Sequence, residues 1–281
     1  MAVSPADEKA SINRACQIIL KSRWIQPQIA IVLGSGLGGL ADRVQHPCIL
    51  NYDQIDGFPR THASGHQGRL ITGFLAGLPV VMMQGRTHRY EGYSDRNVRF
   101  PVQVMHGLGA QLLITTNAAG GLNPRFQVAD LMVIDSHLDF LWTRGAISGQ
   151  VKTHPGIRGQ KECYDSKLVQ RAKLLAKNMC LELHQGCYIA TLGPTFETRS
   201  EYRMFRRFGG DAVGMSTVPE VLMAQQLSMR VLGFSVITNV ASTDIPQSTT
   251  HHEVVSVGDA AGPRLMSIIM ALLDEMAGQP D

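Results

Sequence analysis

The segment that most constrains this chain is an apolar run that passes directly into a glycine-rich turn, residues 28–39 (QIAIVLGSGLGG). The run predicts a buried strand, and the glycines predict a loop immediately after it. Glycine permits positive φ and close approach to a ligand, while free backbone N–H groups in such a loop attract an anion. Ser35 adds a hydroxyl donor there. The segment therefore predicts a phosphate site at the end of a buried strand.

A second interpretation of the same loop is a dinucleotide site. Gly34, Gly36 and Gly39 satisfy the pattern G-x-G-x-x-G, and Asp53 and Asp56 follow near the distance at which an acidic residue would meet a ribose. An NAD-dependent oxidoreductase is therefore an alternative hypothesis. The pattern alone is a weak signal, so the rest of the chain has to decide between the two.

Composition and charge narrow the class of protein. A chain of 281 residues with 44% hydrophobic and 17% charged residues fits an ordinary enzyme with one large or two small α/β domains. The net charge of +3 is scattered, which does not favour nucleic acid as a partner. Five cysteines without a CxxC pair predict neither a disulfide framework nor a zinc ribbon. Residues 1–9 contain no apolar leader, and no stretch approaches the roughly 20 apolar residues of a spanning helix. We therefore expect a cytoplasmic protein without a membrane partner.

Strand-like and helix-like segments alternate along the whole chain. Helices are expected at 6–24, 37–44, 97–108, 166–183, 199–208, from 217 onward, and at 254–276. Strands are expected at 28–33, 69–75 and 78–83 (a hairpin), 111–116, 130–134, 187–192, 212–215 and 231–238, with a small-residue turn at 117–122 and an irregular loop at 143–162. This alternation predicts an α/β fold, a single domain spanning 1–281 with a central mixed β-sheet flanked by helices, and an N-terminal helix within 1–27 packed on it.

Polar side chains follow one predicted strand after another: Ser35, Arg86, His88, Asn117, Glu197, Ser216 and Asn239. Binding groups are expected at strand ends of this kind. Taken singly, each has a structural explanation, since Ser35 suits a turn and Asn239 a turn cap. Glu197 is hardest to explain in that way, because it lies in an apolar turn with glycine and proline.

Six motifs in order along the chain resemble the low-molecular-mass, trimeric purine nucleoside phosphorylases. They are residues 34–38 (GSGLG), 85–92 (GRTHRYEG), 116–122 (TNAAGGL), 193–198 (GPTFET), 214–220 (GMSTVPE) and 237–239 (ITN). The resemblance implies reversible phosphorolysis of 6-oxopurine (deoxy)ribonucleosides such as inosine and guanosine, giving free base and (deoxy)ribose 1-phosphate. It also implies a homotrimer, inorganic phosphate as co-substrate, and neither a metal nor an organic cofactor.

The same resemblance assigns roles to individual residues. The phosphate ligands would be Ser35, Arg86, His88, the backbone N–H of Ala118, and Ser216. The purine contacts would be Phe196, Glu197, Asn239 and Tyr188, and the ribose contacts Tyr90, Met215 and His252, with His251 as a substitute for His252. His66 and Glu91 would lie behind the phosphate, and His88, Glu197 and Asn239 would be the catalytic residues.

Two further alternatives remain open at this point. Residues 144–163 are shorter than the family's segment and lack its pattern, so no residue is assigned there. A nucleoside-binding protein with impaired turnover is therefore one alternative. The other is a methylthioadenosine phosphorylase, in which acidic residues are typical where this chain has Asn239. A carboxylate at Glu197 and an amide at Asn239 instead suit N1–H and a carbonyl at C6, which favours 6-oxopurines.

Overall fold

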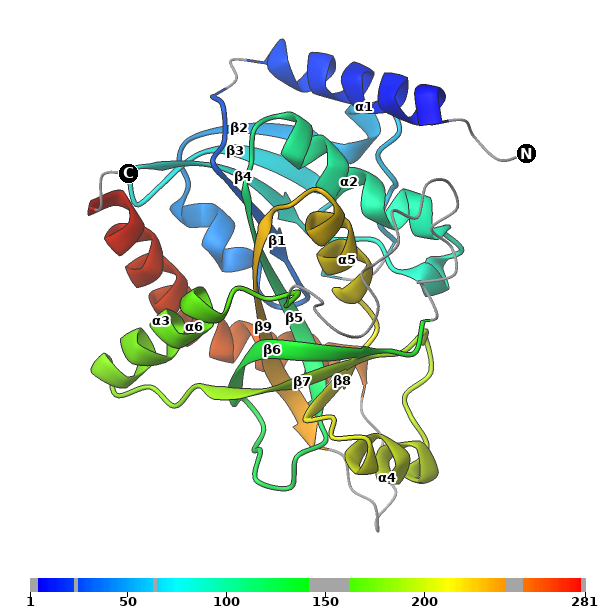
Figure 1. Cartoon of the computed structure of the whole chain (residues 1–281), viewed down its shortest axis with the longest axis vertical. Helices are drawn as coiled ribbons and strands as arrows, with labels where there is room; N and C mark the ends of the chain where they lie inside the picture. Colours follow the sequence, from blue (N-terminus) through cyan, green and yellow to red (C-terminus); the bar gives the residue numbers. More distant parts are fainter. Residues whose placement is uncertain (1–4, 23–24, 63–64, 142–161, 241–249, 279–281) are drawn as a thin grey trace.

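The chain folds around one mixed nine-stranded sheet with helices on both faces (Figure 1). The structure is a computed structural model that describes residues 5–22, 25–62, 65–141, 162–240 and 250–278. The strands are β1 (Ile29–Leu33), β2 (Gln45–Asn51), β3 (Arg69–Leu75), β4 (Leu78–Gln84), β5 (Leu112–Gly121), β6 (Leu131–Asp139), β7 (His184–Ala190), β8 (Ala212–Gly214) and β9 (Arg230–Val240). The helices are α1 (Pro5–Leu20), α2 (Asp95–Gly107), α3 (Ser166–Asn178), α4 (Arg199–Arg207), α5 (Val218–Gln226) and α6 (His251–Gly278), with short 3-10 helices at Gly38–Arg43, Tyr52–Gln54 and Arg89–Glu91.

Part of the sheet closes on itself. The strand order is β2-β3-β4-β1-β5-β8-β7-β6-β9, and β5 also pairs with β9 in parallel along its whole length. The strands β5, β8, β7, β6 and β9 therefore form a closed ring, and β1, β4, β3 and β2 extend from it as an open wing. The expected hairpin at β3 and β4 is confirmed by their antiparallel pairing.

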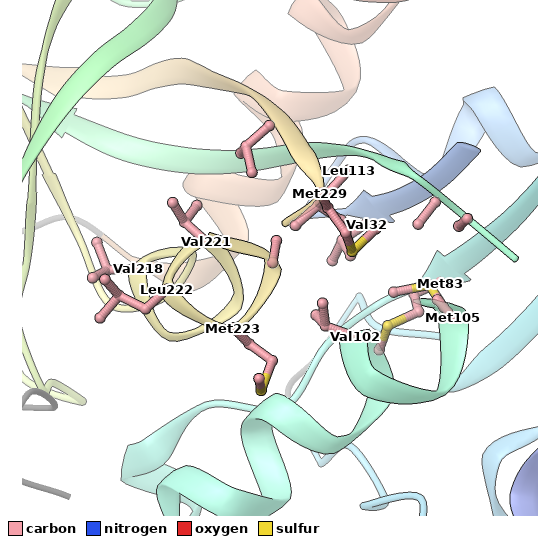
Figure 2. Close-up of a cluster of buried hydrophobic side chains, with 14 of the residues drawn as sticks. Val32, Met83, Val102, Met105, Leu113, Val218, Val221, Leu222, Met223 and Met229 are labelled. Atoms are coloured by element: carbon pink, nitrogen blue, oxygen red, sulfur yellow. The ribbon is translucent and has the colours of Figure 1, made fainter. Parts of the chain in front are cut away.

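The central strands are buried on both faces, as expected for parallel strands covered by helices. Along β1, Ala30 and Val32 face one apolar cluster, while Ile29, Ile31 and Leu33 face another. The first cluster lies under α1, α2 and α5, and Figure 2 shows apolar side chains of α2 and α5 meeting those of the sheet there. The second lies under α3 and α6. The sheet is thus the middle of three layers.

Several helices begin beside residues that are typical of helix starts. The Ser94 side chain accepts from the backbone N–H of Asn97 at the start of α2, and Thr198 does the same for Glu201 at α4. Pro219 lies in the first turn of α5, where a missing N–H costs nothing.

Helix α6 is the one described helix that is long and apolar enough to cross a membrane by length and composition, with a mean hydropathy of 1.3. This differs from the expectation that no such stretch exists. Its residues Leu265, Ile269 and Leu272 are buried in the second cluster against α3 and the sheet, and 39% of the apolar window is buried. Packing within the fold accounts for this part of its composition.

Two expectations about local structure are wrong, and one strand was not predicted. The turn expected at 117–122 is part of β5, because pairing with β9 and β8 continues to Gly121 and outweighs the small-residue turn signal. Strand β2 was not predicted, since an edge strand with Pro47 and mostly exposed side chains lacks an apolar pattern. The segment 37–44 forms a 3-10 helix rather than an α-helix. The loop expected at 143–162 lies almost wholly outside the described residues.

Candidate active site

One cavity collects the polar groups that follow the predicted strands. It opens to solvent and is lined from the ends of β1, β4, β8 and β9, the C-terminal half of β5, the loops before β3 and after β7, and the start of α6. The predicted residues that line it are Ser35, His66, Arg86, His88, Tyr90, Ala118, Phe196, Glu197, Met215, Ser216 and Asn239.

Ser35 and His66 form a hydrogen-bonded pair at one end of the cavity. The Nδ1 atom of His66 lies 2.7 Å from the carbonyl oxygen of Arg86 and 3.2 Å from its backbone N–H, and we assign the proton to Nδ1 because the contact with the carbonyl is the shorter one. Nε2 is then an acceptor, and it lies 3.1 Å from Ser35 Oγ, so the serine hydroxyl donates to it. Burial, with the neighbouring His88 and Arg86 charges, lowers the pKa of His66 to about 4. The imidazole is therefore neutral at pH 7.

His88 is fixed by Glu91 and by two stacked rings. Glu91 accepts from the backbone N–H of His88 at 2.7 Å, and its Oε1 lies 3.0 Å from His88 Nδ1. His88 stacks between His66 and Tyr90, with ring centroids 5.4 Å and 4.8 Å away. Hydrogen bonds from His88 and the backbone of His62 lower the pKa of Glu91 against the opposing effect of burial, so the carboxylate stays charged. Glu91 thus orients the ring of His88, which lines the cavity.

Arg86 lies beneath this end of the cavity and is 1% exposed. Its Nη1 donates to Ser216 Oγ at 3.2 Å and to Thr217 Oγ1 at 2.9 Å, and lies 3.2 Å from Glu220 Oε2. Nη2 donates to the backbone carbonyl of Thr116. The guanidinium is thus part of a buried polar network that reaches the cavity through Ser216.

The other end of the cavity carries a carboxylate and an amide. Glu197 accepts from Thr191 Oγ1 at 2.9 Å, and burial raises its pKa. The Thr238 hydroxyl donates to Asn239 Oδ1 at 3.3 Å, so the amide NH2 group of Asn239 can donate to a ligand in the cavity. Phe196, 43% exposed, lines the same end. An acceptor and a donor are therefore presented beside an aromatic ring.

Three predicted residues do not line the cavity. Tyr188 is fully buried behind β8, with its hydroxyl near the Ser216 backbone N–H, because its ring belongs to the core under β7. His252 is exposed and His251 lines the cavity instead, since successive residues of a helix point in different directions. Glu91 contacts His88 and does not line the cavity, whereas His66, which was expected behind the phosphate, lines the cavity directly.

The dinucleotide interpretation is not supported by the geometry. Gly39, Asp53 and Asp56 are not among the cavity residues, and Asp56 pairs with Arg14 on the surface at 2.9 Å. Within the part of the chain that the structure describes, no group of three or more His, Cys, Asp or Glu side chains is arranged to hold a metal ion.

Sequence reasoning missed the residues that hold Arg86 from below: Thr115, Thr217 and Glu220. Glu220 gives a signal that could have found it, because it is the single acidic residue in the helix VPEVLMAQQ. A carboxylate in an otherwise apolar helix needs a buried cation or donor. Thr217 was expected only as the start of a helix, but it makes no side-chain cap and its hydroxyl accepts from Arg86 and Asn117.

Comparison with known proteins adds to this geometry. Residues 28–274 match the family model described as the phosphorylase superfamily. Purine nucleoside phosphorylase 1 of Bacillus subtilis is 42% identical over 94% of this chain and 98% of its own. Purine nucleoside phosphorylase of Rattus norvegicus is 43% identical over 89% and 90%. The structure of Schistosoma mansoni purine nucleoside phosphorylase in complex with adenosine superposes with a TM-score of 0.87, at 33% identity over 97% of this chain and 98% of that one.

Proposed function

The chain belongs to the phosphorylase superfamily and, within it, to the purine nucleoside phosphorylases, and from that premise we propose that it cleaves 6-oxopurine (deoxy)ribonucleosides with phosphate. The observation that carries the proposal is the division of one cavity into two ends. One end holds the donors Ser35, His88 and Ser216 above Arg86, and the other holds Glu197 and Asn239. The first end can donate hydrogen bonds to an anion, and the second offers an acceptor and a donor to a heterocyclic base.

In the proposed reaction a phosphate oxygen attacks C1′ of the nucleoside as the bond between C1′ and N9 breaks. The electron pair of that bond leaves with the purine, which takes up a proton, and the sugar leaves as ribose 1-phosphate. Positive charge develops on the sugar and negative charge on the base in the transition state. Donors that hold the phosphate dianion below C1′, and polar groups that stabilise the departing purine, lower this barrier by positioning and electrostatic stabilisation.

At the phosphate end, hydroxyl groups and a guanidinium are suitable donors to an anion. Ser216 Oγ accepts from Arg86, so its own proton is available to the phosphate. Ser35 donates to His66 in the structure and would turn its hydroxyl to the anion on binding. The backbone N–H of Ala118 would complete the set, and His88 would donate from Nε2. Tyr90, Met215 and His251 line the space between the two ends, where the ribose would lie.

At the base end, Glu197 would accept from N1–H and Asn239 Nδ2 would donate to O6. Thr238 holds the other side of the amide, which supports this orientation. Adenosine lacks the N1 proton and has an amino group at C6, so it would leave both protein groups unpaired. Sites built on such hydrogen bonds discriminate strongly against analogues that cannot make them.

The proposal includes inorganic phosphate as co-substrate, no metal or organic cofactor, and a cytoplasmic homotrimer. Apolar side chains exposed on and around α4 support an assembly: Leu192, Phe196, Met204 and Phe208 are 37–58% exposed. In Figure 1, α4 lies at one end of the molecule, beside β7 and β8, where a second copy can reach it. Sedimentation equilibrium would give the mass of the assembly, and a monomeric mass would contradict this part of the proposal.

The decisive experiment measures release of free base from inosine and from adenosine, each with and without phosphate. We expect phosphate-dependent release of hypoxanthine and little release of adenine. Release of adenine at a similar rate would contradict the assigned selectivity. Binding of inosine without release of base would favour a nucleoside-binding protein.

A further inference from the structure

The terminal nitrogens of Arg86 already have hydrogen-bond acceptors within the protein. Its two terminal nitrogens carry four hydrogens. They face six acceptors at 3.3 Å or less, namely Ser216 Oγ, Thr217 Oγ1, Glu220 Oε2, Val32 O, Thr115 Oγ1 and Thr116 O. The fifth donor, Nε, is buried and has no hydrogen-bond partner among the described residues. Arg86 therefore lines the cavity with its charge already paired and with one donor unused.

Glu220 supplies that pairing charge. Its carboxylate lies 3.2 Å from Arg86 Nη1, and the two side chains are 4% and 2% exposed. Thr115 Oγ1 donates to the same carboxylate oxygen at 3.0 Å. A buried ion pair of this kind is worth little as net stability, but removing one partner leaves an uncompensated buried charge.

The same network fixes the backbone that presents Ser216. Thr217 has φ of 72° and ψ of −53°, and the backbone N–H of Val218 donates to the carbonyl of Ser216 at 2.8 Å, which forms a γ-turn. Positive φ is strained for a β-branched residue. Arg86 and Asn117 both donate to the Thr217 hydroxyl at 2.9 Å and hold the turn in place. The position of Arg86 therefore decides the position of the Ser216 hydroxyl.

We propose that Glu220 is a positioning residue of the phosphate site, which holds Arg86 beneath Ser216 and competes with phosphate for the arginine charge. The inference rests on the proposed phosphorolysis. With the site empty, the carboxylate balances the guanidinium. When the phosphate dianion binds beside Ser216, the phosphate and the Glu220 carboxylate both attract the Arg86 guanidinium. Phosphate therefore binds more weakly than it would if Arg86 had no carboxylate partner.

The test is Glu220→Gln, which keeps the shape of the side chain and one oxygen to accept from Thr115, and removes the negative charge. We expect the phosphate KM to fall about five- to tenfold while the inosine KM stays within about twofold. Without phosphate the variant should have a lower Tm than the wild type, because Arg86 is left buried without a counter-charge. Added phosphate should raise the Tm of the variant by more than that of the wild type, since binding then supplies the missing charge.

Two more variants complete the design. Glu220→Asp keeps the charge one methylene farther from Arg86, so its phosphate KM should lie between those of the other two proteins, and it serves if Glu220→Gln does not fold. Glu182→Gln removes a carboxylate that is 79% exposed and outside the cavity, and it should change neither KM.

Three outcomes are informative. A phosphate KM that is unchanged or raised in folded Glu220→Gln overturns the inference. A parallel rise of both KM values, with equal responses of Tm to phosphate, would assign Glu220 a purely structural role and overturn it as well. If the wild type itself releases no hypoxanthine in response to phosphate, the proposed function fails instead.

Discussion

His66 makes the stability of the protein depend on pH. Its Nδ1–H donates to the Arg86 carbonyl at 2.7 Å, and Nε2 accepts from the Ser35 hydroxyl at 3.1 Å, so a second proton at Nε2 would break this hydrogen bond unless the hydroxyl turned. Burial is the first cause of its lowered pKa, followed by the like charge of His88 and then, more weakly, Arg86; together they bring it to about 4. The folded protein therefore holds this ring neutral at a pH where an exposed histidine is protonated.

The magnitude follows from linkage. In the unfolded chain the histidine has a pKa of about 6.5, so between about pH 6.5 and pH 4 the unfolded state binds a proton that the folded state does not. The stability that depends on neutral His66 is present above pH 6.5 and is lost as the pH falls. At pH 5 the interval of about 1.5 pH units, at about 1.36 kcal/mol each, corresponds to a loss of about 2 kcal/mol.

Urea unfolding at pH 7 and pH 5 measures this loss in the wild type and in His66→Gln, whose side chain does not titrate. We expect the wild type to lose about 2 kcal/mol more than the variant over this interval. His62→Gln replaces an exposed histidine and should lose as much as the wild type. Equal losses in the wild type and His66→Gln would refute the reasoning, because they would show that His66 is not held neutral.

Three other changes test the base end of the cavity and the packing beneath it. Asn239→Asp should lower kcat/KM for inosine about 10- to 100-fold and raise the relative rate on adenosine, because a donor to O6 becomes an acceptor for an amino group. Asn239→Ala should lower the rate of inosine cleavage without raising that of adenosine. An unchanged inosine-to-adenosine ratio in Asn239→Asp would contradict the assignment. Glu197→Gln should reduce cleavage of inosine but raise the free energy of unfolding at pH 7, because burial raises the pKa of Glu197 and so disfavours its charged form. This gain in stability should disappear as the pH falls and the wild-type carboxyl group is protonated. A gain that persists at acid pH would argue against this cause. Gly214→Ala places a Cβ 2.4 Å from the Tyr188 hydroxyl and should cost about 1–3 kcal/mol in urea unfolding, whereas Gly278→Ala, with nothing within 4 Å, should stay within about 0.5 kcal/mol.

The sequence predicted the elements whose signals are local. The apolar runs of β1, β4 and β9 are read from neighbouring residues, and the structure has strands there. Strand β2 escaped because its stability comes from pairing with β3 rather than from an apolar pattern. The extension of β5 through residues 117–121 escaped for a similar reason, since its partners β8 and β9 follow about 90 residues or more later in the chain.

Candidate site residues could be found where a polar side chain follows a strand, because the topology brings strand ends together. That rule places Ser35, Arg86, Glu197 and Asn239 in one cavity. The rule does not predict Glu220, because Glu220 lies inside a helix. It also could not decide between His251 and His252, because the directions of their side chains depend on where α6 begins. Such assignments require the rotation of a helix about its axis, which neighbouring sequence does not specify.

The glycine loop shows how one pattern can have a different physical cause from the one that its spacing suggests. Gly36 has φ of 71°, and a Cβ there would lie 2.6 Å from the Val255 carbonyl of α6. A Cβ at Gly34 would lie 2.8 Å from the Thr116 carbonyl of β5. These glycines are needed so that the loop can pass between β5 and α6, and this close packing brings Ser35 to the cavity wall beside His66. The third glycine of the G-x-G-x-x-G pattern, Gly39, is exposed beside Met266 and does not line the cavity, so close packing at Gly34 and Gly36 explains the glycines at those two positions.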